Sequence, residues 1–223
     1  MSTDAPVITH GPELRHHFEQ PDQQFESATL GMWTFLVTEI MFFGGLFAAY
    51  TIYRGMYPDA FASTSQYMQV IVGGVNTAVL ICSSLTMALA VRAGHLGQRN
   101  LIILFLIATM VLGAVFLGVK AYEYHHKWVE HLVPGFNWNY ENVRYARQAQ
   151  ILFFLYFLMT GMHALHMIVG EGLLATILVM AVKRRFSARW STPVEIVGLY
   201  WHFVDIVWIF LFPLLYLIGK HKL

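Results

Sequence analysis

The sequence of residues 101–122 reads LIILFLIATMVLGAVFLGVKAY, with no charged residue before Lys120. An α-helix rises about 1.5 Å per residue, so roughly 20 apolar residues cross the hydrocarbon core of a membrane. Lipid offers the backbone no hydrogen-bonding partner, and a run of Leu, Ile, Phe and Met without two-residue alternation favours a helix over a barrel strand. This stretch therefore predicts a transmembrane helix.

Similar apolar runs occur on both sides of this stretch. We expect membrane spans near residues 30–53, 67–91, 101–122, 151–182 and 194–218. The composition agrees, because 57% of the 223 residues are hydrophobic and 12% are charged, whereas soluble domains contain about 25% charged residues. The predicted fold class is an all-α polytopic membrane protein, a bundle of five transmembrane helices. Residues 29–223 form this domain, and residues 1–28 form a polar segment before it.

Composition also argues against several classes of protein. The formal net charge is +1 and no Lys/Arg run is interleaved with aromatics, so nucleic acid is not expected as a partner. The single cysteine, Cys82, closes no internal disulfide and supplies no thiolate metal site alone. The polar, acidic start argues against a cleaved signal peptide. No internal repeat is visible, which disfavours a transporter built on Glu39.

Basic residues near the membrane predict the orientation of the chain. Lys183, Arg184 and Arg185 crowd a short connection, where the positive-inside rule has most weight. The opposite side also carries basic residues, Lys120 and Lys127 among them, but glutamates partly offset these charges. We therefore expect the N-terminus in the cytoplasm and, after five spans, the C-terminus in the periplasm or outside the cell.

Several polar side chains fall within or at the ends of the apolar spans, where each needs a partner because desolvation is costly. They are Glu39, Asn76, His163, His166, Glu171, Glu195, His202 and Asp205. Glu39 lies roughly 13 Å into its span, near the middle of the hydrocarbon. We expect its carboxyl group to be protonated or hydrogen-bonded inside the bundle. Two interpretations stay open, a neutral interhelical hydrogen-bond donor and a proton-linked carboxylate.

The histidines raise the question of a metal site. His163 and His166 are three residues apart and share a helix face, so two imidazoles face one direction. Haem ligation between either of them and His202 on a facing helix is an alternative. We favour hydrogen bonding across helix contacts made by small residues. Asp205, three residues after His202, is placed to orient that imidazole, and no serine or cysteine nucleophile matches the pair.

Five motifs, in this order along the chain, resemble the subunit III family of haem-copper oxidases. They are TEIMFF at 38–43, NTAVL at 76–80, AYEY at 121–124, GMHALHMIVG at 161–170 and YWHFVDIVWIFLF at 200–212. The last is similar to the hallmark final helix of cytochrome c oxidase subunit III. Together the motifs cover nearly all of the membrane part of the chain.

The resemblance implies a function that composition does not show. Subunit III in this family is a bundle without haem or copper that packs against the catalytic subunit, holds lipid and helps to sustain proton uptake. The chain would then be an accessory subunit of a respiratory terminal oxidase, in aerobic electron transport from cytochrome c to oxygen, with no active site of its own. The implied partners are the catalytic haem-copper subunit I and subunit II, which hold haem and copper, together with bound phospholipid and other membrane lipids.

The resemblance also implies roles for individual residues. Glu39 matches the family's intramembrane carboxylate, and Glu195 matches a family acid. His163, His166, His202 and Asp205 fall on family positions that bind no metal. Lys183, Arg184 and Arg185 lie close to a phosphate-contacting arginine of the family, which suggests contact with a lipid headgroup.

Three further inferences follow from the same comparison. The longer family form has seven helices, so a five-helix chain resembles the bacterial versions, and we expect it in the bacterial plasma membrane. An accessory subunit of a quinol oxidase or of a nitric oxide reductase is an alternative within the family. An independent membrane b-type cytochrome with histidine-ligated haem is the alternative from another class.

Overall fold

The computed structural model describes residues 18, 20–136, 138, 145–184, 186 and 191–217. This part of the chain forms the helices α1 (Pro21–Met56), α2 (Pro58–Thr64), α3 (Val70–His95), α4 (Arg99–Val129), α5 (Ala146–Val182) and α6 (Thr192–Phe212). A 3-10 turn, η1 (Ser65–Tyr67), follows α2, and a π-helical turn, η3 (Pro213–Leu217), continues α6. These residues contain no strand, and five of the helices are long and apolar enough to span a membrane. The all-α, multi-pass prediction is confirmed.

The helices extend beyond the apolar runs that predicted them. α1 begins at Pro21, inside the segment expected to be a polar tail, and α4 continues to Val129 although the predicted span ended at residue 122. α3 begins at Val70, slightly later than expected. Hydropathy marks only the part of a helix that contacts hydrocarbon, whereas backbone hydrogen bonding continues into the polar interface. The extra length of α4 places charged side chains in a helix that the sequence assigned to a connection.

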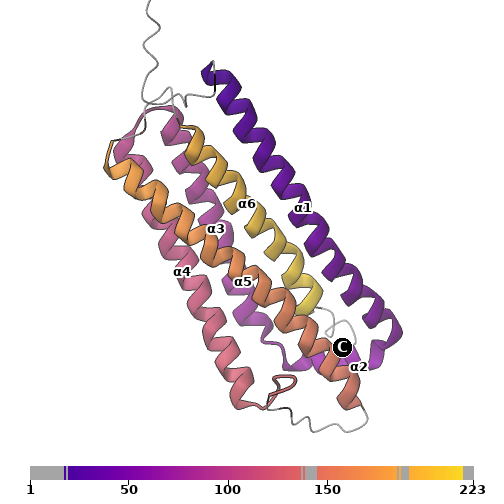
Figure 1. Ribbon diagram of the computed structural model, residues 1–223. Helices are drawn as coiled ribbons and strands as arrows, with labels where there is room; N and C mark the ends of the chain where they lie inside the picture. Colours follow the sequence, from indigo (N-terminus) through magenta and orange to yellow (C-terminus); the bar gives the residue numbers. More distant parts are fainter. Residues whose placement is uncertain are drawn as a thin grey trace, which may run out of the picture.

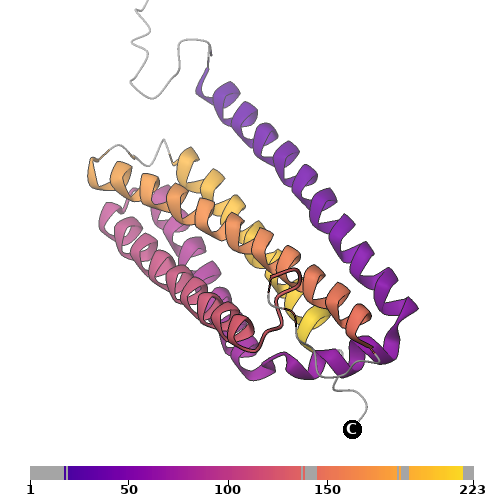
Figure 2. The same cartoon turned by 60° about the horizontal axis from the view of Figure 1, so that its bottom comes forward.

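Helices α3, α4, α5 and α6 form a bundle, and α1 packs against α5 and α6 from outside (Figure 1). In Figure 2, α1 runs along the outside of the bundle, and α2 follows its C-terminal end. In the membrane-spanning window of α1, 17% of the residues are buried within the chain, against 56% for α6. Helix α6 is therefore the central element and α1 a peripheral one.

Trp201 fills the centre of the bundle. Its indole is fully buried and lies against Gly113 of α4 and Gly170 of α5. Its Nε1 donates a hydrogen bond to Oγ of Ser83 on α3 at 3.2 Å. Glycines at these positions allow the backbones to approach a large aromatic ring closely, as is common between membrane helices. One side chain of α6 thus contacts the other three helices of the bundle.

The turn from α3 to α4 lies at the same end of the bundle as the end of α5 and the start of α6 (Figure 1). Gly97 has a φ of 66° in the turn from α3 to α4, a conformation that favours glycine. Arg99, at the start of α4, donates from Nε to the carbonyl oxygen of Ala181 at 3.0 Å and from Nη2 to that of Val182 at 2.8 Å. The guanidinium thereby caps the C-terminus of α5, where cations are favoured. At the opposite end, α2 crosses beneath the bundle (Figure 2).

The contact between Gly113 and Trp201 gives a test of this packing. A Cβ at position 113 would collide with the carboxyl group of Glu171 and lie 2.8 Å from the Trp201 ring, whereas one at Gly118, on the same helix, meets nothing within 4 Å. We expect Gly113→Ala to lower the free energy of unfolding by about 1–3 kcal/mol relative to Gly118→Ala, because the added methyl group overpacks the centre of the bundle. Both variants gain the same helix propensity, so the difference between them reports the packing. Unfolding in mixed micelles measures the difference. Equal stabilities of the two variants would contradict this packing.

Candidate functional site

Lys120 and Glu123 of α4 form an ion pair in the interior of the bundle. Lys120 Nζ donates to Glu123 Oε2 at 2.8 Å and to the hydroxyl oxygen of Tyr216 at 2.6 Å. The hydroxyls of Tyr216 and Tyr156 donate to Glu123 Oε1 at 2.5 and 2.9 Å. All four side chains are buried, with Lys120 5% and Glu123 3% exposed. The cluster therefore joins α4 to α5 and to η3.

Both charged groups of this ion pair have further hydrogen-bond partners. Removing two charges from water is costly unless further hydrogen bonds complete the pair. The Glu123 carboxylate accepts from one ammonium and two phenols, and the Lys120 ammonium also lies 4.4 Å from the centre of the Trp208 ring, a cation–π contact. The charges cancel within the cluster. It acts as a structural tie between helices.

The sequence interpretation missed this cluster because it assigned Glu123 to the connection after the span. A signal was present, since Lys120 and Glu123 are three residues apart and share a helix face. Lys127 and Glu130 repeat the spacing, and Lys127 Nζ donates to Glu130 Oε2 at 2.8 Å and to the carbonyl oxygen of Tyr67 at 2.7 Å. Both lysines are thus neutralised by neighbouring glutamates.

Glu39 of α1 contacts His166 of α5. His166 Nδ1 lies 2.8 Å from the carbonyl oxygen of Met162, which only accepts, so Nδ1 carries a hydrogen. Nε2 lies 3.1 Å from Glu39 Oε2, so the hydrogen bond between them contains one proton, on either the carboxyl group or the imidazole. Both side chains are largely buried, 18% and 13% exposed. The structure gives Glu39 an interhelical partner and attaches α1 to the bundle.

His202 and Asp205 do not pair directly. His202 Nδ1 lies 2.7 Å from Oγ of Ser84 on α3. Asp205 is 3% exposed, and neither of its carboxyl oxygens has a partner with hydrogen-bond geometry among the described residues, although the hydroxyls of Ser83 and Ser84 interact with it. The two side chains share a face of α6 that meets α3, where serine hydroxyls lie between them and compete for the contact. The expected imidazole–acid pair is therefore replaced by contacts to α3.

His163 and His166 face different neighbours despite their spacing. His163 is buried, with its ring centre 5.5 Å from that of Phe116 on α4 and 5.1 Å from that of Trp208 on α6. His166 faces α1 instead and uses both ring nitrogens in hydrogen bonds. Within the residues that the structure describes, no three His, Cys, Asp or Glu side chains are grouped to hold a metal ion. Both His166 nitrogens are therefore used in contacts within the described part of the chain.

Smaller polar contacts tie α3 to its neighbours. Asn76 Nδ2 donates to the carbonyl oxygen of Phe116 on α4 at 3.3 Å, and Trp208 Nε1 of α6 donates to Thr77 Oγ1 at 3.0 Å. The sequence interpretation of Asn76 and Thr77 as interhelical contacts agrees with these distances. The second span is therefore held by hydrogen bonds to two helices.

The remaining predicted site residues lie near the helix ends. Glu195 is in the first turn of α6 and accepts from Ser191 Oγ at 2.6 Å, which suits an acid beside a helix N-terminus. Lys183 and Arg184 are exposed directly after α5, and Arg185 lies outside the described residues.

Comparison with known proteins agrees with the motifs. A family model described as cytochrome c oxidase subunit III matches residues 132–220. The cytochrome c oxidase subunit 3 of Thermostichus vulcanus is 33% identical over 210 residues, 92% of each chain. The cytochrome bo(3) ubiquinol oxidase subunit 3 of Pseudomonas aeruginosa is 32% identical over 209 residues, 93% of this chain and 92% of that one. This chain belongs to the subunit III family of haem-copper oxidases.

Membership of the subunit III family confirms the resemblance seen in the five motifs. A third relative, the cytochrome c oxidase subunit 3 of Corynebacterium diphtheriae, is 34% identical over 192 residues, 85% of this chain and 87% of that one. The chain is thus a multi-pass membrane protein and an accessory member of a multi-subunit oxidase complex. The buried ion pair and the Glu39–His166 contact are features of its scaffold.

The Lys120–Glu123 pair predicts a strongly non-additive double-mutant cycle. Glu123→Gln should lower the free energy of unfolding by about 3–5 kcal/mol, because it leaves a buried ammonium without its counter-charge. The double variant Lys120→Met/Glu123→Gln should recover much of that loss, since no uncompensated charge remains. Unfolding of the purified protein in micelles measures the cycle. Losses that simply add would show that the two side chains are not coupled.

The Glu39–His166 contact predicts a difference between two substitutions. Glu39→Gln should leave assembly into the complex largely intact, because an amide donates to His166 Nε2 as a protonated carboxyl group does. Glu39→Ala should weaken assembly, at a cost of about 1–3 kcal/mol for an unsatisfied buried imidazole nitrogen. The amount of chain retained in the purified complex measures both effects. Equal, severe loss in the two variants would contradict a hydrogen-bonding role.

Proposed function

We propose that the chain is a non-catalytic accessory subunit of a respiratory terminal oxidase that transfers electrons from cytochrome c to oxygen. It stabilises the catalytic haem-copper subunit I, beside subunit II, and supports proton uptake there. Haem and copper belong to those partners, and this chain holds phospholipid instead. The observation that carries the proposal is the use of ionisable side chains as interhelical ties in the Lys120–Glu123 and Glu39–His166 contacts.

The ties support a scaffold role because they use several of the ionisable side chains that redox or hydrolytic chemistry would need. His166 has both ring nitrogens in hydrogen bonds, and His202 shares Nδ1 with Ser84. Glu123 accepts three hydrogen bonds within its own cluster. Such networks rigidify a bundle. A rigid apolar bundle is suited to hold a neighbouring membrane subunit and its lipids in place.

Charge placement supports an orientation and a lipid contact within this proposal. Lys183 and Arg184 are exposed at the end of the bundle where α1 begins, whereas Lys120 and Lys127 are buried and paired with glutamates at the other end. We place Lys183 and Arg184 on the cytoplasmic side of a bacterial plasma membrane, with the N-terminus, against the phosphate of an anionic lipid. The C-terminus then lies on the periplasmic or outer side.

The relatives belong to oxidases that are named for different electron donors, cytochrome c or quinol. The family contains cytochrome c oxidase subunits and quinol oxidase subunits, and the Bacillus subtilis quinol oxidase subunit 3 shares 30% identity with this chain. A quinol oxidase complex is therefore the second candidate. A copurified subunit with a copper-containing cytochrome c docking domain indicates the first candidate, and its absence indicates the quinol oxidase or a nitric oxide reductase.

The decisive experiment is a subunit inventory of the gently solubilised complex, with and without this chain. We expect the haem-copper subunit to copurify with the chain, and we expect the complex lacking it to start at a similar rate and lose activity sooner over repeated turnovers. The isolated chain should show no Soret band, which separates an accessory subunit from a b-type cytochrome. A Soret band that His202→Ala abolishes would overturn the proposal.

A further inference from the structure

The outward side of α6 is a strip between α1 and α3 that nothing in the described part of the chain covers. Ile206, Ile209 and Phe210 of this strip are 50%, 45% and 61% exposed, although α6 is otherwise the most buried of the spanning helices. A hollow of about 480 Å³ separates α1 from α6, and one of about 260 Å³ separates α3 from α6. His202 and Ile206 line both hollows. The strip is therefore a ridge with a hollow on each side.

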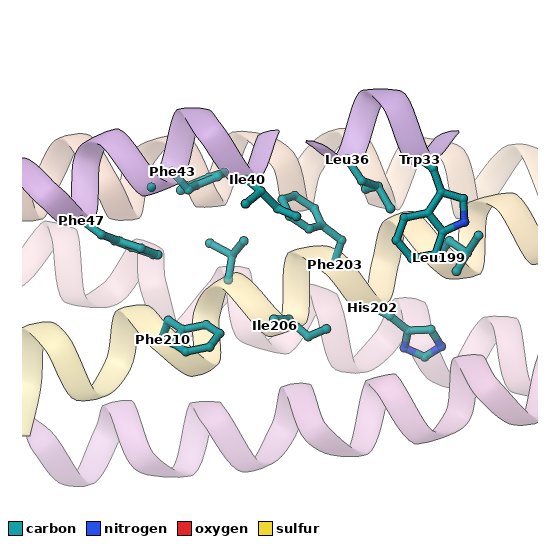
Figure 3. A pocket seen from close by; sticks show the side chains of 12 residues that line it. Trp33, Leu36, Ile40, Phe43, Phe47, Leu199, His202, Phe203, Ile206 and Phe210 are labelled. Carbon is teal, nitrogen blue, oxygen red and sulfur yellow. The ribbon is translucent and has the colours of Figure 1, made fainter. Parts of the chain in front are cut away.

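The hollow beside α1 is apolar. Figure 3 shows Phe43 and Phe47 of α1 facing Phe203 and Phe210 of α6 across it, with His202 near one end. The hollow beside α3 is different, because Ser84, His202 and Asp205 form a polar notch in its wall. Apolar side chains or acyl chains can fill the hollow beside α1. The hollow beside α3 also requires a polar group that meets the notch.

The polar notch has unused hydrogen-bonding capacity. Asp205 is 3% exposed, lines the hollow and has no partner of good geometry for either carboxyl oxygen among the described residues. The Nδ1 atom of His202 is hydrogen-bonded to the hydroxyl group of Ser84, so the Nε2 atom is left for a group outside the chain. A buried carboxyl group without a partner, and an imidazole nitrogen beside it, are costly within hydrocarbon unless a donor or acceptor meets them. The notch therefore fits a polar group brought by another molecule.

The depth of the notch decides which molecule can bring that group. His202 lies ten residues after Thr192, the first residue of α6, or about 15 Å along the helix. This is near the middle of a hydrocarbon core of roughly 30 Å, where phospholipids present acyl chains and no headgroup. A transmembrane helix of a neighbouring subunit can present a hydroxyl or amide side chain at this depth. Its neighbouring side chains would fill the two hollows beside the Ile206 ridge, as ridges pack into grooves.

We propose that the α3–α6 face is the docking surface for a transmembrane helix of another oxidase subunit, which places one hydrogen-bonding side chain in the notch of Ser84, His202 and Asp205. A serine, threonine or asparagine side chain both donates and accepts, and so matches the carboxyl group and the imidazole together. This inference rests on the proposed accessory function and adds the surface and the chemistry of the contact.

Photocrosslinking in the intact complex tests the docking surface. Ile206 is replaced by p-benzoylphenylalanine, and Val111 serves as the matched control. Val111 is 56% exposed on α4, between Thr109 and Gly113, which contact the same level of the bundle as the notch. Irradiation of membranes should join position 206, and not position 111, to a different oxidase subunit. An adduct at 206 with lipid only, with a quinone or with a second copy of this chain would overturn the proposal.

Substitutions in the notch test the polar contact separately. Asp205→Leu should reduce the neighbouring subunit retained after mild detergent washing several-fold, whereas Asp205→Asn, which keeps hydrogen-bonding groups, should retain most of it. The thermal stability of the chain itself is measured in parallel, and it should change little between the two variants. Equal retention in both variants, or a loss that follows the stability of the chain, would contradict a docking role.

The two experiments separate this inference from the function on which it rests. If oxidase subunits copurify with the native chain but position 206 captures none of them, the docking surface is wrong and the accessory function stands. If no oxidase subunit copurifies with the native chain, the proposed function itself is wrong.

Discussion

The structure depends on one constraint, that a polar group within hydrocarbon must find its partner in protein because lipid provides none. The Lys120–Glu123 pair, completed by Tyr156 and Tyr216, meets this constraint with three elements of the fold. At the other end of the bundle, Arg99 donates hydrogen bonds to the last carbonyl oxygens of α5. In the centre, the indole nitrogen of Trp201 donates to the hydroxyl oxygen of Ser83. Each of these groups has at least one partner on a different element of the fold, so satisfying the polar groups also fixes how the helices pack.

The same constraint connects the fold to a supporting role in an oxidase complex. Side chains that would serve as ligands or acid–base groups, such as His166 and Glu123, are used in contacts that hold the bundle together. Helix α1 lies at the edge and is attached through Glu39 and the buried Phe43, while α6 carries the interior packing. A subunit built in this way has a rigid centre. It also has an outward strip on α6, beside which Asp205 has no partner of good geometry among the described residues.

The sequence predicted the spanning helices well, because a run of about 20 apolar residues is a local property of the chain and is by itself long enough to cross the hydrocarbon core. It also predicted that Glu39 needs a partner, since its depth follows from helix geometry. It did not predict Lys120 and Glu123 as interior residues. The predicted span ended between these two residues, at residue 122, and only a partner on another element, here Tyr216, makes both charges compatible with burial.

The sequence alone established an all-α membrane protein of five spans and, through the motifs at 161–170 and 200–212, its family. It could not establish which polar groups meet. His163 and His166 lie on one face by spacing, yet one packs on Trp208 and the other bonds Glu39. His202 bonds Ser84 instead of the acid three residues away. Spacing along a helix fixes only the direction of a side chain, whereas its partner depends on which helix packs there and at what height.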